Sequence, residues 1–169
     1  MKSGCSAPPR AWVASAFTRN ERILDVACGT GIVARSVLKQ VAAGRIVGVD
    51  VNPGMLAVAR SISVGQDMAI AWVEASALQL PFADGSFDVV LCQLGLQFFP
   101  DPLTALREMI RVLVPGGRLA LSVYSAIEST PAAHTLAEAL DLHLGPDASK
   151  IKRSEHSFRD PTQLHRLLA

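Results

Sequence analysis

Two aspartates and a glycine turn are the residues of this chain whose types and spacing suggest ligand chemistry. Asp25 lies late in a short apolar run, Gly29 and Gly31 follow it, and Asp50 ends a second apolar run. The glycines let backbone N–H groups approach a ligand without an intervening Cβ, and they open a helix whose N-terminus favours negative charge. An aspartate at a strand end can accept two hydrogen bonds from vicinal ribose hydroxyls. The pattern predicts a nucleotide site.

The identity of the nucleotide depends on Asp25. The segment Gly29–Ala34 fits the GxGxxA turn of dinucleotide-binding proteins, and Asp50 follows at about the right distance for a ribose acid, so a nicotinamide cofactor has to be considered. A pyrophosphate at this turn would be repelled by the Asp25 carboxylate, whereas a ligand with a cationic amino-acid end would be attracted. S-adenosylmethionine has this makeup, because it offers an adenosine to Asp50, a carboxylate to backbone amides, and an ammonium and a sulfonium to Asp25.

A strand–helix–strand unit must position these residues. The apolar run Ile23–Ala27 predicts the first strand, the helical period of Gly31–Ala42 predicts the helix, and Arg45–Val49 predicts the second strand, which ends on Asp50. This order is that of one βαβ unit with a nucleotide-binding turn.

The remainder of the chain continues the alternation of strand and helix. We expect a helix from Pro53, strands at Asp67–Glu74 and Phe87–Cys92, a helix at Pro102–Leu113, a strand at Arg118–Tyr124 after a tight turn, and helices at Pro131–Leu144 and Thr162–Leu168. Five such alternations predict an α/β fold, a doubly wound parallel sheet with helices on both faces. We expect a disordered leader at residues 1–6 and one domain over residues 7–169. Pro8 and Pro9 are expected to open a helix near the start of this domain.

The apolar periodicity also predicts which helix faces are buried. The helix from Pro53 should bury Met55, Leu56, Val58 and Ala59. The helix at Pro102–Leu113 should bury Leu103, Leu106, Ile110 and Leu113 and expose Arg107, Glu108 and Arg111. The polar stretch Gly145–Ser157 is expected to be a loop.

Composition excludes several classes of protein. The net charge of +1 gives no electrostatic case for nucleic acid or an anionic membrane. Cys5, Cys28 and Cys92 are an odd number without a CxxC pair, which argues against a disulfide scaffold or a metal site and suits the cytoplasm. No stretch approaches the roughly 18 apolar residues of a membrane-spanning helix.

Four blocks, in order, resemble the class I S-adenosylmethionine-dependent methyltransferases, in particular the small-molecule branch that includes quinone-biosynthesis enzymes and the methyltransferase type 11 domain. The blocks are ILDVACGTG (Ile23–Gly31), VGVDVNPGMLAVAR (Val47–Arg60), ALQLPFADGSFDVVLC (Ala77–Cys92) and LVPGGRLALSV (Leu113–Val123). Two positions depart from the family pattern: Ala27 replaces its first glycine, and Ser76 replaces the acid that often binds the adenine amino group.

The resemblance implies a Rossmann-like sheet of strand order 3-2-1-4-5 and a cofactor site for S-adenosylmethionine. Asp50 would bind the ribose, Met55 would lie near the adenine, and Ser76 with the Ala77 backbone would contact the adenine edge. The full set of implied cofactor residues is Asp25, Ala27, Cys28, Gly29, Gly31, Asp50, Val51, Met55, Ser76, Ala77 and Gln93. The implied reaction is methyl transfer to a small organic acceptor by direct displacement at the sulfonium methyl, with no general base assigned.

The loop after the fourth strand should complete the pocket. Gln93 follows that strand at the edge where an open parallel sheet forms its crevice. Further along the same loop, we expect the pocket wall to include Leu94, Gln97, Phe98 and Phe99.

Two other functions stay open at this stage. One is a nicotinamide-dependent oxidoreductase, and the other is a non-catalytic binding module or fragment. The family's sheet normally adds an antiparallel hairpin beside strand 5, and no such hairpin is evident after residue 123. We therefore expect a C-terminally truncated domain whose exposed strand 5 could pair with a second copy in a homodimer.

Overall fold

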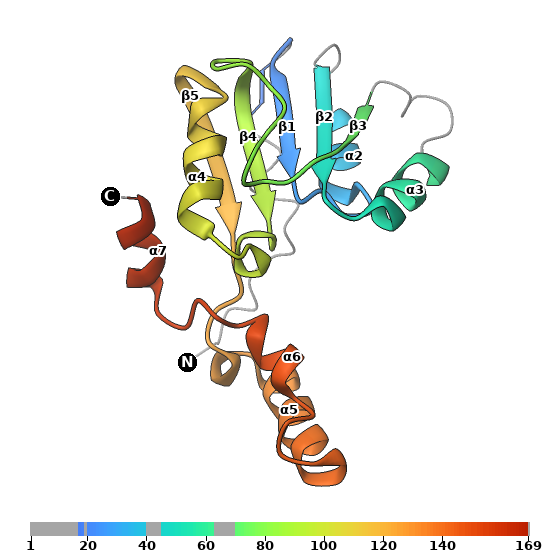
Figure 1. The fold of residues 1–169 in the computed structure, drawn as a ribbon, viewed down its shortest axis with the longest axis vertical. Coiled ribbons are helices and arrows are strands. Elements are labelled where there is room, and N and C mark those ends of the chain that lie inside the picture. The colour runs from blue at the N-terminus through green and yellow to red at the C-terminus, as the bar shows by residue number, and fades with distance from the viewer. Residues whose placement is uncertain (1–16, 19, 40–44, 63–69, 169) are drawn as a thin grey trace, which may run out of the picture.

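The computed structural model describes residues 17, 18, 20–39, 45–62 and 70–168. The expected leader at residues 1–6, the expected helix after it, the end of the predicted helix at 40–42 and the start of the predicted strand at 67–69 lie outside the described residues. Within the described part of the chain, five parallel strands form one sheet in the order β3-β2-β1-β4-β5 (Figure 1). The predicted fold class and strand order are therefore confirmed.

The first strand of the chain lies at the centre of this sheet. The strands are β1 (Arg22–Val26), β2 (Arg45–Asp50), β3 (Ile70–Glu74), β4 (Phe87–Gln93) and β5 (Leu113–Ser122). Asp25 is paired with Gly48 on one side and with Leu91 on the other. Strands β1 and β4 are buried along nearly their whole length, which explains their continuous apolar sequences. Asp25 is thus a carboxylate in the middle of an apolar sheet.

Helices cover both faces of the sheet. The helices of the described chain are α2 (Ile32–Leu38), α3 (Pro53–Ile62), α4 (Pro102–Arg111), α5 (Pro131–Leu144), α6 (Lys150–Ser154) and α7 (Pro161–Leu168), with short 3₁₀ helices η2 (Leu96–Phe98) and η3 (Ile127–Ser129). Figure 1 shows α4 in front of the sheet and α2 behind it. Residues of α4 and α7 join one apolar cluster, and residues of α2 join the other.

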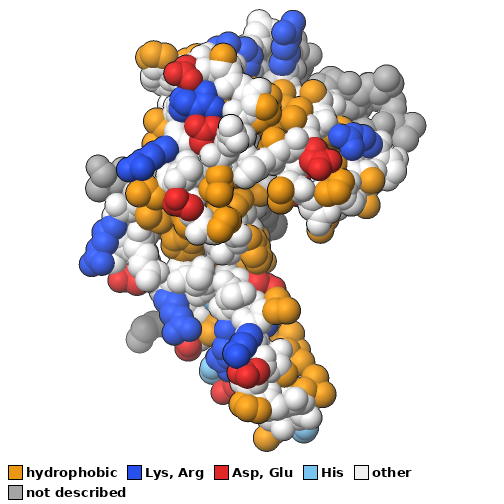
Figure 2. All heavy atoms as spheres, viewed as in Figure 1, with side chains coloured by type: hydrophobic (Ala, Val, Ile, Leu, Met, Phe, Trp, Pro, Cys, Tyr) orange, Lys and Arg blue, Asp and Glu red, His pale blue; other side chains and the backbone are white. Residues whose placement is uncertain are grey.

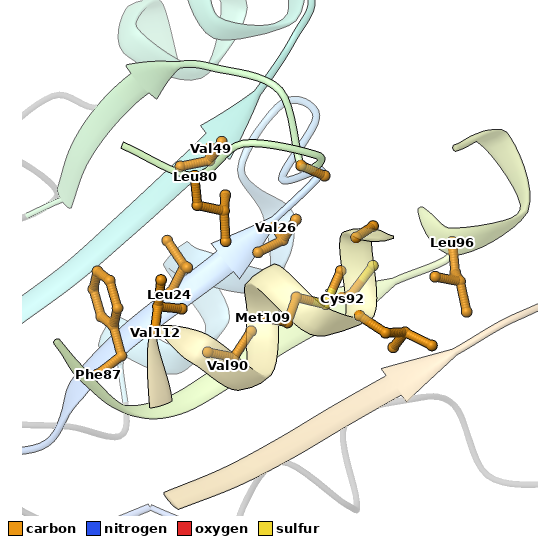
Figure 3. Close-up of a cluster of buried hydrophobic side chains, with 13 residues drawn as sticks. Leu24, Val26, Val49, Leu80, Phe87, Val90, Cys92, Leu96, Met109 and Val112 are labelled. Carbon is orange, nitrogen blue, oxygen red and sulfur yellow. The ribbon is translucent and has the colours of Figure 1, made fainter. Parts of the chain in front are cut away.

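The larger cluster forms the core between α4 and the face of the sheet that α4 covers. Leu24, Val26 and Val90 from the sheet meet Met109 of α4, and Leu80 comes from the loop after β3 (Figure 3). Each of these side chains is at most 3% exposed. Burying one side chain of this size contributes about 1.5–3 kcal/mol, so this cluster sets the position of α4 and of the loop relative to the sheet.

Trp72 explains two of the glycines. A Cβ at Gly48 would lie 2.5 Å from the Trp72 ring, and a Cβ at Gly31 would lie 2.2 Å from it. No side chain can be placed at such distances without moving the tryptophan. Gly31 and Gly48 therefore let Trp72 of β3 pack across β2 and against the turn that begins α2.

Two predicted helix faces are wrong in part. In α3, Leu56 and Ala59 are buried as expected, but Met55 and Val58 are 43% and 44% exposed. In α4, the inward residues are Ala105, Leu106 and Met109, whereas Leu103 and Ile110 are exposed. Apolar periodicity allows several neighbouring stripes on a short helix, and docking on the sheet selects one of them.

The predictions for β5 and for the stretch 145–157 also need correction. β5 begins at Leu113 rather than Arg118, and the predicted turn lies within it as a shift in register against β4, with Gly116 at φ +78°. The stretch expected to be a loop contains α6. Its first turn is held by Asp141 of α5, which accepts hydrogen bonds from the Ser149 hydroxyl and the Arg153 guanidinium at 2.7 and 3.0 Å. Local sequence does not reveal these longer-range bonds.

Helices α5 and α6 project beyond the carboxyl ends of the strands (Figure 1). Ile127 of η3 packs with Ala133 and Ala137 in a small apolar cluster at the base of α5. Figure 2 shows hydrophobic side chains along the outer side of this projection. None of the described helices has the length and the apolar character needed to cross a membrane.

Candidate cofactor site

The turn between β1 and α2 has an unusual backbone. Ala27, Gly29 and Gly31 all have positive φ angles, of 55°, 54° and 79°. The N–H of Cys28 donates to the carbonyl of Val49 at 3.0 Å, and the N–H of Gly31 donates to the carbonyl of Cys28 at 2.8 Å. A Cβ placed on Gly29 would meet no atom within 4 Å. Gly29 therefore provides a left-handed conformation with an open face.

Asp50 holds this turn from the end of β2. Its Oδ2 accepts a hydrogen bond of 2.8 Å from the Gly29 N–H, and its Oδ1 accepts one of 2.9 Å from the Asn52 N–H. A carboxylate has about four acceptor positions, so roughly one remains on each oxygen. Two remaining acceptors match the vicinal hydroxyls of a ribose, and the backbone bonds fix the orientation of the carboxylate before a ligand arrives.

Asp25 is the second carboxylate of the site. It is 1% exposed, and its Oδ2 accepts a hydrogen bond of 3.1 Å from the Ala34 N–H in α2. Burial raises the pKa of Asp25 to about 7, and the nearby negative charge of Asp50 adds to this effect. A cationic group next to Asp25 would stabilise its charged form and lower that pKa.

The two aspartates line two cavities that share Ala27. The first cavity, the Asp50 cavity, has a volume of about 210 Å³ and is lined by Ala27, Val49, Asp50, Val51, Ala75, Ser76, Ala77, Leu78, Phe98, Phe99 and Pro100. The second, the Asp25 cavity, has a volume of about 440 Å³ and is lined by Asp25, Ala27, Cys28, Gly29, Thr30, Ile32, Val33, Met55, Gln93 and Leu94. A ligand with one half for each aspartate could extend across Ala27.

The structure brings together ten of the eleven residues that the sequence implicated in cofactor binding, since all of them except Gly31 line one of the two cavities. Met55, which was expected beside the adenine, lines the Asp25 cavity and not the Asp50 cavity. Gly31 lines neither, its N–H is bonded to Cys28, and its missing side chain accommodates Trp72.

The loop after β4 contributes to both cavities. Phe98 and Phe99 line the Asp50 cavity, and Leu94 lines the Asp25 cavity, as expected. Gln97 lines neither; its side-chain amide donates to the Leu94 carbonyl at 2.9 Å, and it faces a separate cavity beside α7. Seven lining residues were not predicted, although each lies within or directly beside a stretch that the sequence analysis identified: Thr30, Ile32, Val33, Val49, Ala75, Leu78 and Pro100.

Backbone strain is concentrated at the Asp25 cavity. Ala27 and Leu94 both line it, and their φ angles are 55° and 54°. A left-handed conformation costs a residue with a side chain on the order of 1–3 kcal/mol, and such strain is most frequent at functional sites. A Cβ on Gly95 would lie 2.7 Å from the Ala27 methyl, so the loop after β4 needs a glycine where it passes the turn.

The two cysteines near the site are suited to packing. Cys28 and Cys92 are both buried and unpaired. Burial raises the pKa of the Cys92 thiol to about 12 and also raises that of Cys28, which the neighbouring carboxylate of Asp25 increases further. Thiols in this state carry almost no thiolate at neutral pH, so neither is an effective nucleophile.

Comparison with known proteins identifies the family. A model of the methyltransferase domain matches residues 24–121, which include the turn and both aspartates. The chain belongs to this methyltransferase domain family.

The curated relatives of this chain align with it over only part of their own length. A demethylmenaquinone methyltransferase of Thermus thermophilus is 44% identical over 99 residues, which cover 59% of this chain and 45% of the relative. A ubiquinone/menaquinone biosynthesis C-methyltransferase of Proteus mirabilis is 34% identical over 141 residues, or 82% and 56% of the two chains. The chain spans about half the length of the curated relatives it matches.

Solved structures agree with the fold of the methyltransferase domain. The crystal structure of a protein from Bacillus halodurans, named as a candidate methyltransferase, superposes with a TM-score of 0.71 and 28% identity over 94% of this chain and 64% of that protein. The [4+2]-cyclase SpnF superposes with a TM-score of 0.62 and 31% identity over 66% and 42% of the two chains. Family membership alone therefore does not decide the reaction.

Proposed function

We propose that this chain binds S-adenosylmethionine across the Asp25 and Asp50 cavities and transfers its methyl group to a small organic acceptor. The observation that carries the proposal is the meeting of the two cavities at Ala27, with one carboxylate on each side. The relation to demethylmenaquinone methyltransferases supports it.

The residues present fit each half of this cofactor. In the Asp50 cavity, Asp50 has acceptors for the ribose hydroxyls, and the apolar walls formed by Leu78 and Phe99 suit a flat base. In the Asp25 cavity, a buried carboxylate suits an ammonium or a sulfonium. A pyrophosphate in that place would add negative charge beside Asp25, which disfavours a nicotinamide dinucleotide.

The chain's own contribution to the reaction is binding and orientation. S-adenosylmethionine supplies an activated methyl group on its sulfonium. Asp50 and the turn at Gly29 hold the nucleoside end, and Asp25 holds the amino-acid end, so the direction of the methyl group is defined by two fixed carboxylates. The apolar walls of the cavities exclude water.

For the acceptor, we propose a reduced naphthoquinone. The support is the names of the relatives, which include a 2-phytyl-1,4-naphtoquinone methyltransferase of Synechococcus elongatus that is 38% identical over 110 residues. Transfer to a ring carbon forms a carbon–carbon bond, breaks the carbon–sulfur bond and releases one proton from the acceptor.

Calorimetric titration with S-adenosylhomocysteine, the demethylated product, tests the cofactor assignment, with NADH as the competing ligand. We expect saturable binding of S-adenosylhomocysteine and none of NADH. NADH binding without S-adenosylhomocysteine binding would overturn the proposal in favour of an oxidoreductase. Transfer of a labelled methyl group from S-adenosylmethionine to a 1,4-naphthoquinol then tests the reaction, and binding without transfer to any quinol would favour the non-catalytic alternative.

We also propose that β5 mediates a homodimer. Among the described residues, β5 forms one edge of the sheet, because its only strand neighbour there is β4. An unpaired edge can hydrogen-bond to a second strand. Light scattering over a range of concentrations tests this, and a monomer mass at every concentration would contradict it.

A further inference from the structure

We infer that Glu108 and Arg111 of α4 are positioning residues that hold the adenine side of the Asp50 cavity in its binding shape, and so set the selectivity of this chain for the adenine base. The inference rests on the proposed function. It assigns a role to two side chains that touch neither cavity and that the sequence pattern placed on a solvent-exposed face.

The wall in question is the loop that follows β3. Ala75, Ser76, Ala77 and Leu78 line the Asp50 cavity, and they lie outside any helix or strand. A local turn shapes this wall, because the Ser76 hydroxyl accepts from the Leu78 N–H and the Ser76 carbonyl accepts from the Gln79 N–H, both at 3.1 Å. Its backbone groups are the ones available to an adenine edge.

Glu108 holds the loop directly after this turn. Its Oε2 accepts a hydrogen bond of 2.7 Å from the Leu80 N–H, although the two residues are 28 positions apart. The side chain of Leu80 is 3% exposed and belongs to the main core cluster. Backbone and side chain of Leu80 are therefore both anchored two residues beyond the cavity wall.

Arg111 completes the attachment. Its guanidinium donates to the carbonyls of Leu80 and Phe82 at 3.0 and 2.8 Å and to the carboxylate of Asp84 at 2.8 Å. It also donates to both oxygens of Glu108, at 2.7 and 2.8 Å. The guanidinium fork thus ties three loop positions and the Glu108 carboxylate together, which a lysine ammonium cannot reproduce.

Together these contacts make one rigid bracket between α4 and the cavity wall. In the view of Figure 2, acidic and basic side chains lie next to each other over the end of α4. The side chains of Glu108 and Arg111 are only 18% and 30% exposed, so their hydrogen bonds are partly shielded from water. Without the bracket, the loop would adopt other shapes, and the apparent dissociation constant would rise in inverse proportion to the population of the competent shape.

Two ligands separate this role from a general loss of stability. S-adenosylhomocysteine carries the adenine amino group, and S-inosylhomocysteine carries an oxygen in its place. We expect Glu108→Gln and Arg111→Lys to weaken S-adenosylhomocysteine binding by about tenfold. A loss of this size corresponds to a loop that adopts its binding shape in about one tenth of the molecules. Binding of S-inosylhomocysteine should change much less, so the preference for adenine should fall toward unity.

Asp88→Asn is the matched control. Asp88 likewise accepts a backbone N–H, from Arg22 at 2.8 Å, and binds the Arg22 guanidinium, but it lies at the amino ends of β1 and β4 and lines neither cavity. We expect this variant to lose comparable thermal stability while keeping the adenine preference of the unaltered chain. Arg111→Lys retains the positive charge and provides a second variant if Glu108→Gln does not fold.

The outcomes distinguish a failure of the proposed cofactor binding from a failure of the role assigned to Glu108 and Arg111. If the unaltered chain fails to bind S-adenosylhomocysteine, the proposed function is overturned, and this inference with it. If the unaltered chain prefers S-adenosylhomocysteine and both α4 variants keep the same preference, the inference alone is overturned.

Discussion

The backbone N–H of Gly29 donates a 2.8 Å hydrogen bond to the side chain of Asp50. This bond joins the end of β2 to the turn that follows β1, across 21 positions of sequence. It means that Asp50 both shapes the glycine turn and presents its remaining acceptors to a ligand. The two features that first indicated a nucleotide site are therefore a single structural unit.

Removing the Asp50 carboxylate should abolish most of the cofactor affinity. Asp50→Ala loses both proposed ribose bonds and the bond to Gly29, and hydrogen bonds to a charged group contribute about 1.5–3 kcal/mol each. We therefore expect S-adenosylhomocysteine to bind about a hundredfold more weakly, as measured by calorimetry. Asp147→Ala is a control, because Asp147 lies in the exposed loop between α5 and α6, where it forms an ion pair with Lys150. Unchanged affinity in Asp50→Ala would contradict the ribose assignment.

Asp25 should make stability and binding depend on pH in opposite directions. Its folded pKa of about 7 lies above its ordinary value of 3.8, so its contribution to the free energy of unfolding is fully present at low pH and is lost as the pH rises toward 7. One such group changes that free energy by at most about 1.4 kcal/mol per pH unit. The free energy of unfolding, measured by urea denaturation between pH 3.8 and pH 7, should fall with this slope in the unaltered chain. The slope contributed by this group should be absent in Asp25→Asn.

Binding of a cationic ligand should instead improve as the pH rises through 7. The charged form of Asp25 then predominates and can pair with the ammonium or the sulfonium, so S-adenosylmethionine binding below that pH should release a proton. Calorimetry in buffers of different ionisation enthalpy measures this release. If binding releases no proton near pH 6, or if Asp25→Asn releases the same number of protons as the unaltered chain, the protonation of Asp25 does not depend on the ligand.

Ala27→Gly should be tolerated, whereas Ala27→Val should be strongly destabilising. Ala27 has a φ of 55°, which costs about 1–2 kcal/mol in a residue with a side chain and nothing in glycine. The greater chain entropy of unfolded glycine offsets about 0.4–1 kcal/mol of that gain. Valine adds β-branching at this φ and bulk toward Gly95. Equal stability of the valine and glycine variants in chemical denaturation would contradict the assigned strain.

Gly48→Ala should destabilise the chain through Trp72. The added Cβ would lie 2.5 Å from the indole and 3.0 Å from the sulfur of Cys28, and overpacking of this kind costs about 1–3 kcal/mol. Trp72→Phe removes the ring atoms that clash, so Gly48→Ala should cost less in that background. A double-mutant cycle measures the coupling, and an additive result would show that the tryptophan does not require the glycine.

Much of the fold was predictable because it depends on local patterns that repeat. The apolar runs of β1, β2 and β4 predicted buried parallel strands, the alternation with helices predicted a doubly wound sheet, and the family resemblance implied the strand order. Helix α7 was predicted to within one residue of its observed range, and α6 was missed because a hydrogen bond network with Asp141 holds it. The buried stripe of α4 was misassigned, since docking on the sheet selects among similar stripes.

By itself, the sequence determined the class of fold and thirteen of the twenty residues that line the two cavities, because these thirteen lie in or beside short local motifs. Only the tertiary structure decided that Gly31 and Gly48 make room for Trp72, that Asp50 bonds to Gly29, and that Glu108 and Arg111 support the loop behind the Asp50 cavity. These are contacts between residues far apart in the chain. No local pattern encodes which partners the closed sheet brings together.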